Sequence, residues 1–171
     1  AVSARGIGVT VYNGSSTDSY AALYQPQAAA VSSTARVTVT SDPAGGFAGG
    51  AGLIERNAMS APTGSPAAVT LYVSWNATIV MAWNASGGRD VDSRFAVPGV
   101  LVHSPVTLQL VRSGSTYTGY YSTNGGATWA PVDTVTVAAA ASAGPQDVGV
   151  FHASGFPTWT TTATFTGLSV G

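Results

Sequence analysis

The sequence offers few acidic residues for hydrolytic chemistry on sugars. Glycoside hydrolysis uses two carboxyl groups that flank the scissile bond, one as the acid and the other as nucleophile or base. This chain has a single glutamate, Glu55, so a pair of catalytic glutamates is impossible. Asp90 and Asp92 are the acids closest together in sequence, and on a strand they would share one face as near neighbours. That arrangement suits a cation or a solvated strand edge better than a cleft between two carboxylates.

Nucleophilic catalysis finds equally little support. The chain has no cysteine, which excludes a thiolate nucleophile, a thiolate zinc site and a disulfide scaffold. The chain contains serines, aspartates and two histidines, His103 and His152, so counting residues does not exclude a Ser–His–Asp triad. However, the Gly-x-Ser-x-Gly turn around a nucleophilic serine is absent. His103 precedes Pro105 in a turn and His152 follows an apolar run, so we expect both at the surface or at strand ends. We therefore expect no enzyme, with a polysaccharide lyase that uses Tyr, Arg or His as the alternative.

Composition and periodicity predict an all-β chain. Only 8% of the 171 residues are charged, 45% are hydrophobic, and 21 glycines are spread along the sequence. Polar and apolar residues alternate in 36–40, 69–75, 106–112 and 133–137, which predicts strands with one buried face. Further strands are expected at 7–12, 51–56, 78–84, 116–122, 147–152 and 163–170. Tight turns are expected at 75–78, 112–115 and 124–126, and 138–145 is a linker or a single helical turn. We expect one β-sandwich over residues 1–171.

Four segments in fixed order resemble one known fold family. They are 51–57, 106–114, 116–129 and 163–170. Together they look like the concanavalin A-like, laminin G-like jelly-roll modules of bacterial secreted glycoside hydrolases and polysaccharide lyases. The resemblance implies two stacked antiparallel sheets, one of them concave. It does not settle function, since this superfamily includes binding modules, glucanases and domains without a known ligand.

The resemblance places a ligand on the concave sheet, where aromatic rings pack on sugar faces and polar side chains bind hydroxyls. The candidate ligand-binding residues are Tyr72, Trp83, Asn84, Arg56, Arg89 and Trp159. Arg56 and Arg89 are candidates for a bidentate grip on a carboxylate-bearing sugar, although Arg89 pairing with surface acids is the competing interpretation. Trp159 is either an exposed ligand contact or a hydrophobic plug at one end of the sandwich.

Alternation separates some of these candidates. In 69–75 the apolar set ends with Trp75, which predicts a buried Trp75 and an exposed Tyr72. In 78–84 the bulkier apolar set includes Trp83, which favours the core for Trp83 and the open face for Asn84. Val80 and Ala82 fall on the same open face as Asn84. Their small side chains fit either the floor of a groove or a sheet face with no ligand.

The segment 122–129 also resembles the Asp-box hairpin, with Asn124 in place of the usual aspartate. In that motif the polar residue satisfies backbone donors, Gly126 takes a conformation that other residues resist, and the aromatic packs under the turn. We interpret it as a structural turn.

The remaining expectations concern partners. A formal charge of −1 without a basic run argues against nucleic acid, and no segment is long and apolar enough for a membrane span. No signal peptide opens the chain, so a leader would lie upstream. Relatives often hold a structural calcium, for which Asp42, Asp90, Asp92 and Asp147 are the available ligands, with no contiguous calcium loop.

These observations predict a non-catalytic carbohydrate-binding module of a secreted enzyme, which holds the catalytic domain of the same parent chain on its polysaccharide. A spacer domain that binds no sugar is the first alternative. A small lyase or hydrolase with a non-standard site is the second.

Overall fold

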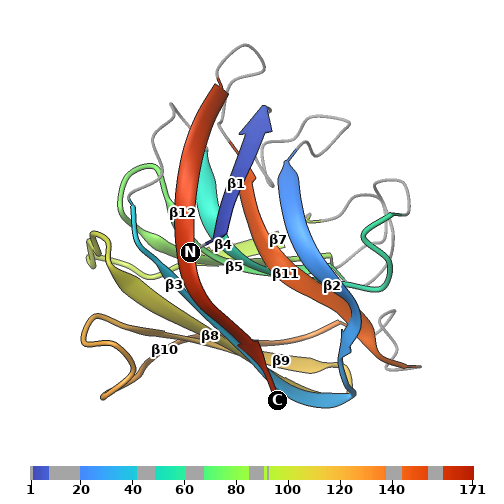
Figure 1. The fold of residues 1–171 in the computed structure, drawn as a ribbon. Coiled ribbons are helices and arrows are strands. Elements are labelled where there is room, and N and C mark those ends of the chain that lie inside the picture. The colour runs from blue at the N-terminus through green and yellow to red at the C-terminus, as the bar shows by residue number, and fades with distance from the viewer. Residues whose placement is uncertain are drawn as a thin grey trace.

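A computed structural model describes residues 2–7, 20–41, 49–60, 68–84, 91, 93–137, 144–153 and 160–171, with backbone alone for 2–7 and 160. Within these ranges, twelve strands form two antiparallel sheets (Figure 1). Sheet A has the order β1 (Val2–Ile7), β12 (Thr160–Val170), β3 (Ser32–Val39), β8 (Val106–Ser113), β9 (Thr116–Ser122), β10 (Ala130–Thr136). Sheet B has the order β2 (Ala21–Ala29), β11 (Gln146–Ala153), β4 (Gly50–Arg56), β5 (Val69–Ser74), β6 (Ile79–Trp83), β7 (Ser93–Ala96). The all-β chain expected from alternation and the two-sheet antiparallel sandwich implied by the resemblance are both confirmed.

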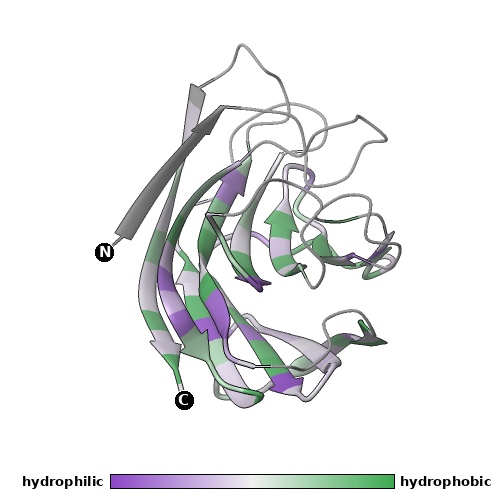
Figure 2. Cartoon of the chain, turned by 90° about the vertical axis from the view of Figure 1, so that its right-hand side faces the viewer, coloured by the Kyte–Doolittle hydropathy of each residue, from purple (hydrophilic) through white to green (hydrophobic). Residues whose placement is uncertain are grey.

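The main core lies between the sheets. Every second residue of the central strands points inward, including Leu53 and Leu71 from sheet B and Leu108 from sheet A, all fully buried. Figure 2 shows the resulting bands of hydrophobic and hydrophilic residues along the strands. Gly119 of β9 brings the sheets close, because a Cβ there would lie 3.1 Å from side chains of both Leu71 and Met81. In the described part of the chain, no helix is long and apolar enough to cross a membrane.

Three edge strands, β1, β2 and β7, were not predicted from the sequence. β2 contains Pro26 and does not alternate, and β7 has four residues. Each pairs with one neighbour only, so a proline or a short strand is tolerated there. The strand expected at 7–12 and the helical turn at 138–145 fall largely outside the described residues.

The predicted turns are confirmed. The β8–β9 turn has Gly114 at φ +64, and the β9–β10 turn has Gly125 at +69 and Gly126 at +92, a region that disfavours other residues. The β5–β6 turn contains Ala77 at φ +61, a conformation that costs a non-glycine residue of order 1 kcal/mol.

The interior of the Asp-box-like turn matches the expected motif. The Asn124 side-chain oxygen accepts the Thr128 N–H at 3.0 Å, and its amide donates to the Thr128 hydroxyl at 2.9 Å. The Ser122 hydroxyl accepts the Gly126 N–H at 2.8 Å. A Cβ on Gly126 would lie 3.2 Å from the Trp129 ring, so the indole packs directly against this glycine. The turn therefore fixes the position of Trp129.

We expect Asn124→Ala to lower the free energy of unfolding by about 0.5–1.5 kcal/mol, because two exposed hydrogen bonds to Thr128 are lost and water replaces them in part. Asn124→Asp retains the acceptor of the motif and should cost less. Denaturant unfolding measures both, with Thr123→Ala as the exposed neighbouring control. Equal stability of Asn124→Ala and Thr123→Ala would contradict this account of the turn.

Candidate functional site

Three of the predicted ligand residues share the outer face of sheet B, but they are not exposed there. Arg56 of β4, Tyr72 of β5 and Asn84 after β6 are each at most 4% exposed. Tyr72 belongs to a second apolar cluster on this face, where its ring meets that of Phe151 edge-on at 5.6 Å. The predicted exposure of Tyr72 is wrong, and so is the open position predicted for Asn84, which lies on the expected face but is buried there. Alternation assigns a residue to a face of the sheet, but it does not show whether that face is itself covered.

Polar contacts hold two of these side chains. Arg56 Nη1 donates to the Met59 carbonyl at 3.1 Å, so this guanidinium serves the loop that follows its own strand. Burial raises the pKa of Tyr72 to about 12, against the opposing charge of Arg94 and the hydrogen bond that Arg94 makes with it. Arg94, an exposed residue of β7 that the sequence analysis passed over, joins this face at its edge. Ligand binding by Arg56, Tyr72 and Asn84 stays a prediction.

The structure confirms the position predicted for Trp83 and contradicts the position predicted for Trp75. Trp83 is half-buried and packs against the main core, on the face opposite Tyr72, as favoured. Trp75 is 45% exposed, so its predicted burial is wrong. β5 ends at Ser74, and Trp75 is the first residue of the turn, where strand alternation no longer holds. Arg89 and Trp159 lie outside the described residues.

Trp75 lines a pocket at one end of the sandwich, which we call the Trp75 pocket. Its volume is about 240 Å³, and its walls are the β5–β6 turn and the segment before β8. The lining residues are Ser74, Trp75, Asn76, Ala77, Leu101 and His103. Leu101 is 69% exposed and His103 is exposed as expected, so an indole, an aliphatic chain, an amide and an imidazole border the same small space.

Backbone hydrogen bonds hold the Trp75 pocket in place. Trp75 N–H donates to the Gly49 carbonyl at 2.9 Å, and Val102 N–H donates to the Ala77 carbonyl at 2.7 Å. The Ser74 hydroxyl contacts the Asn76 side chain and donates to the Thr78 carbonyl at 3.0 Å. Turn and facing segment are therefore joined, and little ordering remains for a ligand to impose.

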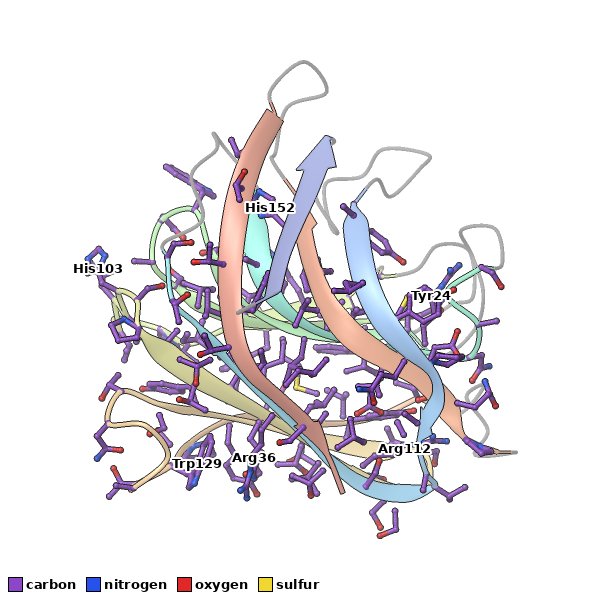
Figure 3. All side chains as sticks on the ribbon, in the orientation of Figure 1. Tyr24, Arg36, His103, Arg112, Trp129 and His152 are labelled. Atoms are coloured by element: carbon purple, nitrogen blue, oxygen red, sulfur yellow. The ribbon has the colours of Figure 1, made fainter. Side chains whose placement is uncertain are left out.

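A second aromatic group, half-buried, lies on the outer face of sheet A. Trp129, at the end of the β9–β10 turn, lies beneath the Arg36 guanidinium of β3, with the Arg36 Cζ 5.5 Å from the ring centroid (Figure 3). Arg36 Nε also donates to Gln109 Oε1 of β8 at 2.6 Å. No local sequence pattern indicates this cluster, because Arg36 and Trp129 are brought together by the register of β3, β8 and β9.

His152 is fully buried next to the last residue of β11, so of the two expected positions the strand end is confirmed and the surface is wrong. Its Nδ1 faces the Gly50 carbonyl at 3.1 Å, which requires a proton on Nδ1, and its Nε2 accepts from the Thr161 hydroxyl at 2.6 Å. Burial lowers the pKa of His152 despite these contacts, so the ring is a neutral structural element.

The surroundings of Asp147 do not fit a calcium ion. Its carboxylate accepts from Gln27 N–H at 2.9 Å, from the Gln27 amide at 3.1 Å and from Met59 N–H at 2.7 Å. Burial works against the charged form, but these bonds prevail and lower the pKa of Asp147. Donors therefore occupy the oxygens that a cation would need. Within the described ranges no group of three His, Asp or Glu side chains converges, and the other three predicted ligands lie outside them.

Glu55 lies inside the sandwich. It is fully buried on the inner face of β4, and neither of its oxygens has a hydrogen-bond partner among the described residues. Burial raises the pKa of Glu55 to about 8, although the charge of Arg112 opposes this. At neutral pH the carboxyl is therefore mostly protonated, and no substrate can reach it.

Comparison with known proteins matches the fold and leaves the family open. No family model matches, and no curated protein matches in sequence. Among solved structures, a xylan β-1,4-xylosidase from Bacillus halodurans superposes with a TM-score of 0.62 over 97% of this chain and 32% of its own, at 16% identity. Sheep galectin-11 matches at 0.53 over 88% of this chain and 97% of its own, at 9% identity. The Klebsiella pneumoniae alginate lyase matches at 0.51 over 83% and 60%, at 13% identity. The chain thus spans about a third of the xylosidase.

Proposed function

We propose that this chain is a non-catalytic carbohydrate-binding module, of the concanavalin A-like jelly-roll type, from a secreted multidomain polysaccharide-degrading enzyme. The Trp75 pocket carries the proposal. Sugar rings have apolar C–H faces that pack on an indole and hydroxyl groups that bind amide and imidazole groups, and Trp75, Asn76 and His103 supply these together. The pocket is smaller than the roughly 300–1,000 Å³ of drug-sized ligand sites, so it suits a single sugar unit.

Two further observations support the proposal. The sole glutamate is enclosed in the core, which removes it from any cleft where it could act on a glycosidic bond. In addition, the fold corresponds to a minor part of a xylosidase and to much of an alginate lyase, both named for action on polysaccharides. An accessory position beside a catalytic domain agrees with the one-third coverage of the xylosidase. An extracellular location is part of the proposal, because polysaccharides of this kind are degraded outside the cell.

We expect Trp75→Ala to weaken polysaccharide binding about 10- to 100-fold, because a single central aromatic often contributes 2 kcal/mol or more at an interface. The measurement is retention and titration calorimetry of the whole chain on neutral and uronic acid polysaccharides, with product analysis alongside. Tyr24→Ala is the matched control: Tyr24 is 37% exposed and lies far from His103 in the view of Figure 3.

The outcomes separate the candidate functions. The proposed binding module is supported if the chain binds a polysaccharide without forming product, and if this binding is lost in Trp75→Ala and kept in Tyr24→Ala. No retention of the folded chain on any polymer would overturn it and favour the spacer. Product formation would contradict the non-catalytic assignment and favour a lyase or hydrolase.

A further inference from the structure

The Arg36 side chain is held in position on an open sheet face. Its Nε donates to Gln109 Oε1, and its flat guanidinium lies over the Trp129 indole. The residue is nevertheless exposed, and its two terminal amino groups make no hydrogen bond with any described residue. An arginine restrained at Nε and stacked on a ring has lost much of the freedom that a ligand would otherwise have to restrict.

The groups around Arg36 are mainly donors. A guanidinium cannot accept a hydrogen bond, so Gln109 turns its oxygen to Arg36 and leaves its amide hydrogens outward. The Trp129 indole N–H has no partner among the described residues, and the same is true of the Tyr120 hydroxyl. Four side chains of sheet A thus offer donors to solvent. We call them the Arg36 surface: Arg36, Gln109, Tyr120 and Trp129.

Register places Arg36, Gln109 and Tyr120 in one row across three neighbouring strands. Gln109 lies directly opposite Arg36 on one side and Tyr120 on the other. Neighbouring strands are about 4.8 Å apart, so the backbones at Arg36 and Tyr120 are separated by about 10 Å, and the Arg36 side chain reaches across part of this distance to Gln109. The neighbouring rows of this face are neutral, with pairs such as Thr38–Thr107 and Thr118–Thr134.

No described Asp or Glu competes for Arg36 on this face. Glu55 lies in the core and Asp147 in sheet B. Asp133 of β10 lies opposite Gly119, whose missing side chain would point into the core, so Asp133 points away from the outer face. The Arg36 charge is therefore uncompensated by the described residues around it.

We propose that the Arg36 surface binds a uronic acid unit of an acidic polysaccharide. The terminal amino groups of Arg36 pair with the sugar carboxylate, while the Gln109 amide, Trp129 and Tyr120 bind ring oxygens and sugar faces. Planar bidentate donors match a carboxylate, and the predominance of donors disfavours a cationic ligand. This inference rests on the proposed function but uses a face of the sandwich other than the Trp75 pocket.

The test compares Arg36→Gln, Arg36→Lys and Arg94→Gln in titrations with oligogalacturonate and oligoalginate, with a neutral xylo-oligosaccharide and a sulfated glycan as the other arms. Arg94→Gln is the charge control, since it removes one exposed arginine from the opposite sheet and changes the net charge equally. Because Arg94 also hydrogen-bonds Tyr72, denaturant unfolding of this variant checks that its fold is intact. We expect Arg36→Gln to lose about 10- to 100-fold in uronate affinity. Arg36→Lys retains the positive charge but lacks the planar pair of donors, so we expect its loss of uronate affinity to be intermediate.

Added salt should weaken uronate binding by the wild type and have little effect on binding by Arg36→Gln. Equal uronate affinity of Arg36→Gln and Arg94→Gln would overturn the inference, as would preference for the sulfated glycan. Neutral binding that depends on Trp75, with no uronate binding, would overturn this inference while the proposed function stands. Uronate binding that depends on Arg36 but not on Trp75 would support the inference and reject the Trp75 pocket.

Discussion

Glu55→Gln is expected to flatten the dependence of stability on pH between about 5 and 8. The pKa of Glu55 is raised by burial to about 8 in the folded chain, against an ordinary value of 4.5. Between these values the unfolded chain has released the proton that the folded chain keeps, so stability falls as pH rises. The wild type should lose about 3 kcal/mol from this group between about pH 5 and pH 7.5, and the Glu55→Gln variant should not.

Equilibrium unfolding of both proteins across this range gives the difference curve. Subtracting one stability curve from the other removes the contribution of His152, which is the same in both proteins. This subtraction is needed because the pKa of His152 is lowered by folding, so its contribution to stability rises with pH below the unfolded pKa and opposes that of Glu55. The variant should become progressively more stable relative to the wild type as pH rises. Parallel stability curves would show that Glu55 is not a buried, protonated carboxyl.

Arg112→Met is expected to destabilise the chain by about 3–5 kcal/mol, because a buried guanidinium here serves many backbone groups. Arg112 is 1% exposed and donates to the carbonyls of Ala29 at 3.2 Å, Gly144 at 2.9 Å and Gly114 at 3.1 Å. These carbonyls belong to β2, to the segment before β11 and to the β8–β9 turn, so one side chain joins sheet A to sheet B. Methionine fills the space and leaves the carbonyls unpartnered.

The control for Arg112→Met is Arg36→Gln, which removes an exposed arginine and should cost less than about 1 kcal/mol. Thermal or denaturant unfolding at about pH 6 measures both variants. A loss below about 1 kcal/mol for Arg112→Met would contradict the structural role assigned to this cluster.

The polar interior around Arg112 extends to neighbouring strands. The Arg112 guanidinium lies 5.8 Å from the Tyr117 ring centroid, and the Tyr117 hydroxyl donates to Gln146 Oε1 at 2.7 Å. The Gln146 amide then donates to Asn57 Oδ1 at 2.9 Å. Burial raises the pKa of Tyr117 to about 12, the charge of Arg112 opposes this shift, and that of Glu55 adds to it. The cluster therefore specifies how the two sheets meet at this end.

Alternation in the sequence is enough to predict most of the strands, and it also indicates the inner-face position of two charged residues. Glu55 follows Ala51 and Leu53 at every second position, and Arg112 follows Leu108 and Leu110 in the same way. Both therefore fall on the inner face by the rule that placed the leucines there. Their burial is nevertheless unexpected from residue type, because charged residues are rarely fully buried.

The candidate sites were less accessible to sequence reasoning for two physical reasons. Trp75 was placed by extending the alternation of β5 one residue past its end, where the chain already turns. The Arg36–Trp129 contact joins residues 93 positions apart through the register of three strands, and no local pattern encodes such a register. The second apolar cluster that buries Tyr72 likewise depends on cross-strand neighbours such as Phe151.

The most direct test of the proposed carbohydrate-binding role is a titration of the ¹⁵N-labelled chain with neutral and uronic acid oligosaccharides, observed at the indole N–H signals of its four tryptophans. Trp75→Phe identifies the Trp75 signal. We predict a saturable shift of the Trp75 signal with at least one oligosaccharide, while the signal of Trp83, packed against the core, stays in place. A Trp75 signal that no oligosaccharide shifts, in a chain whose fold is intact, would contradict the account.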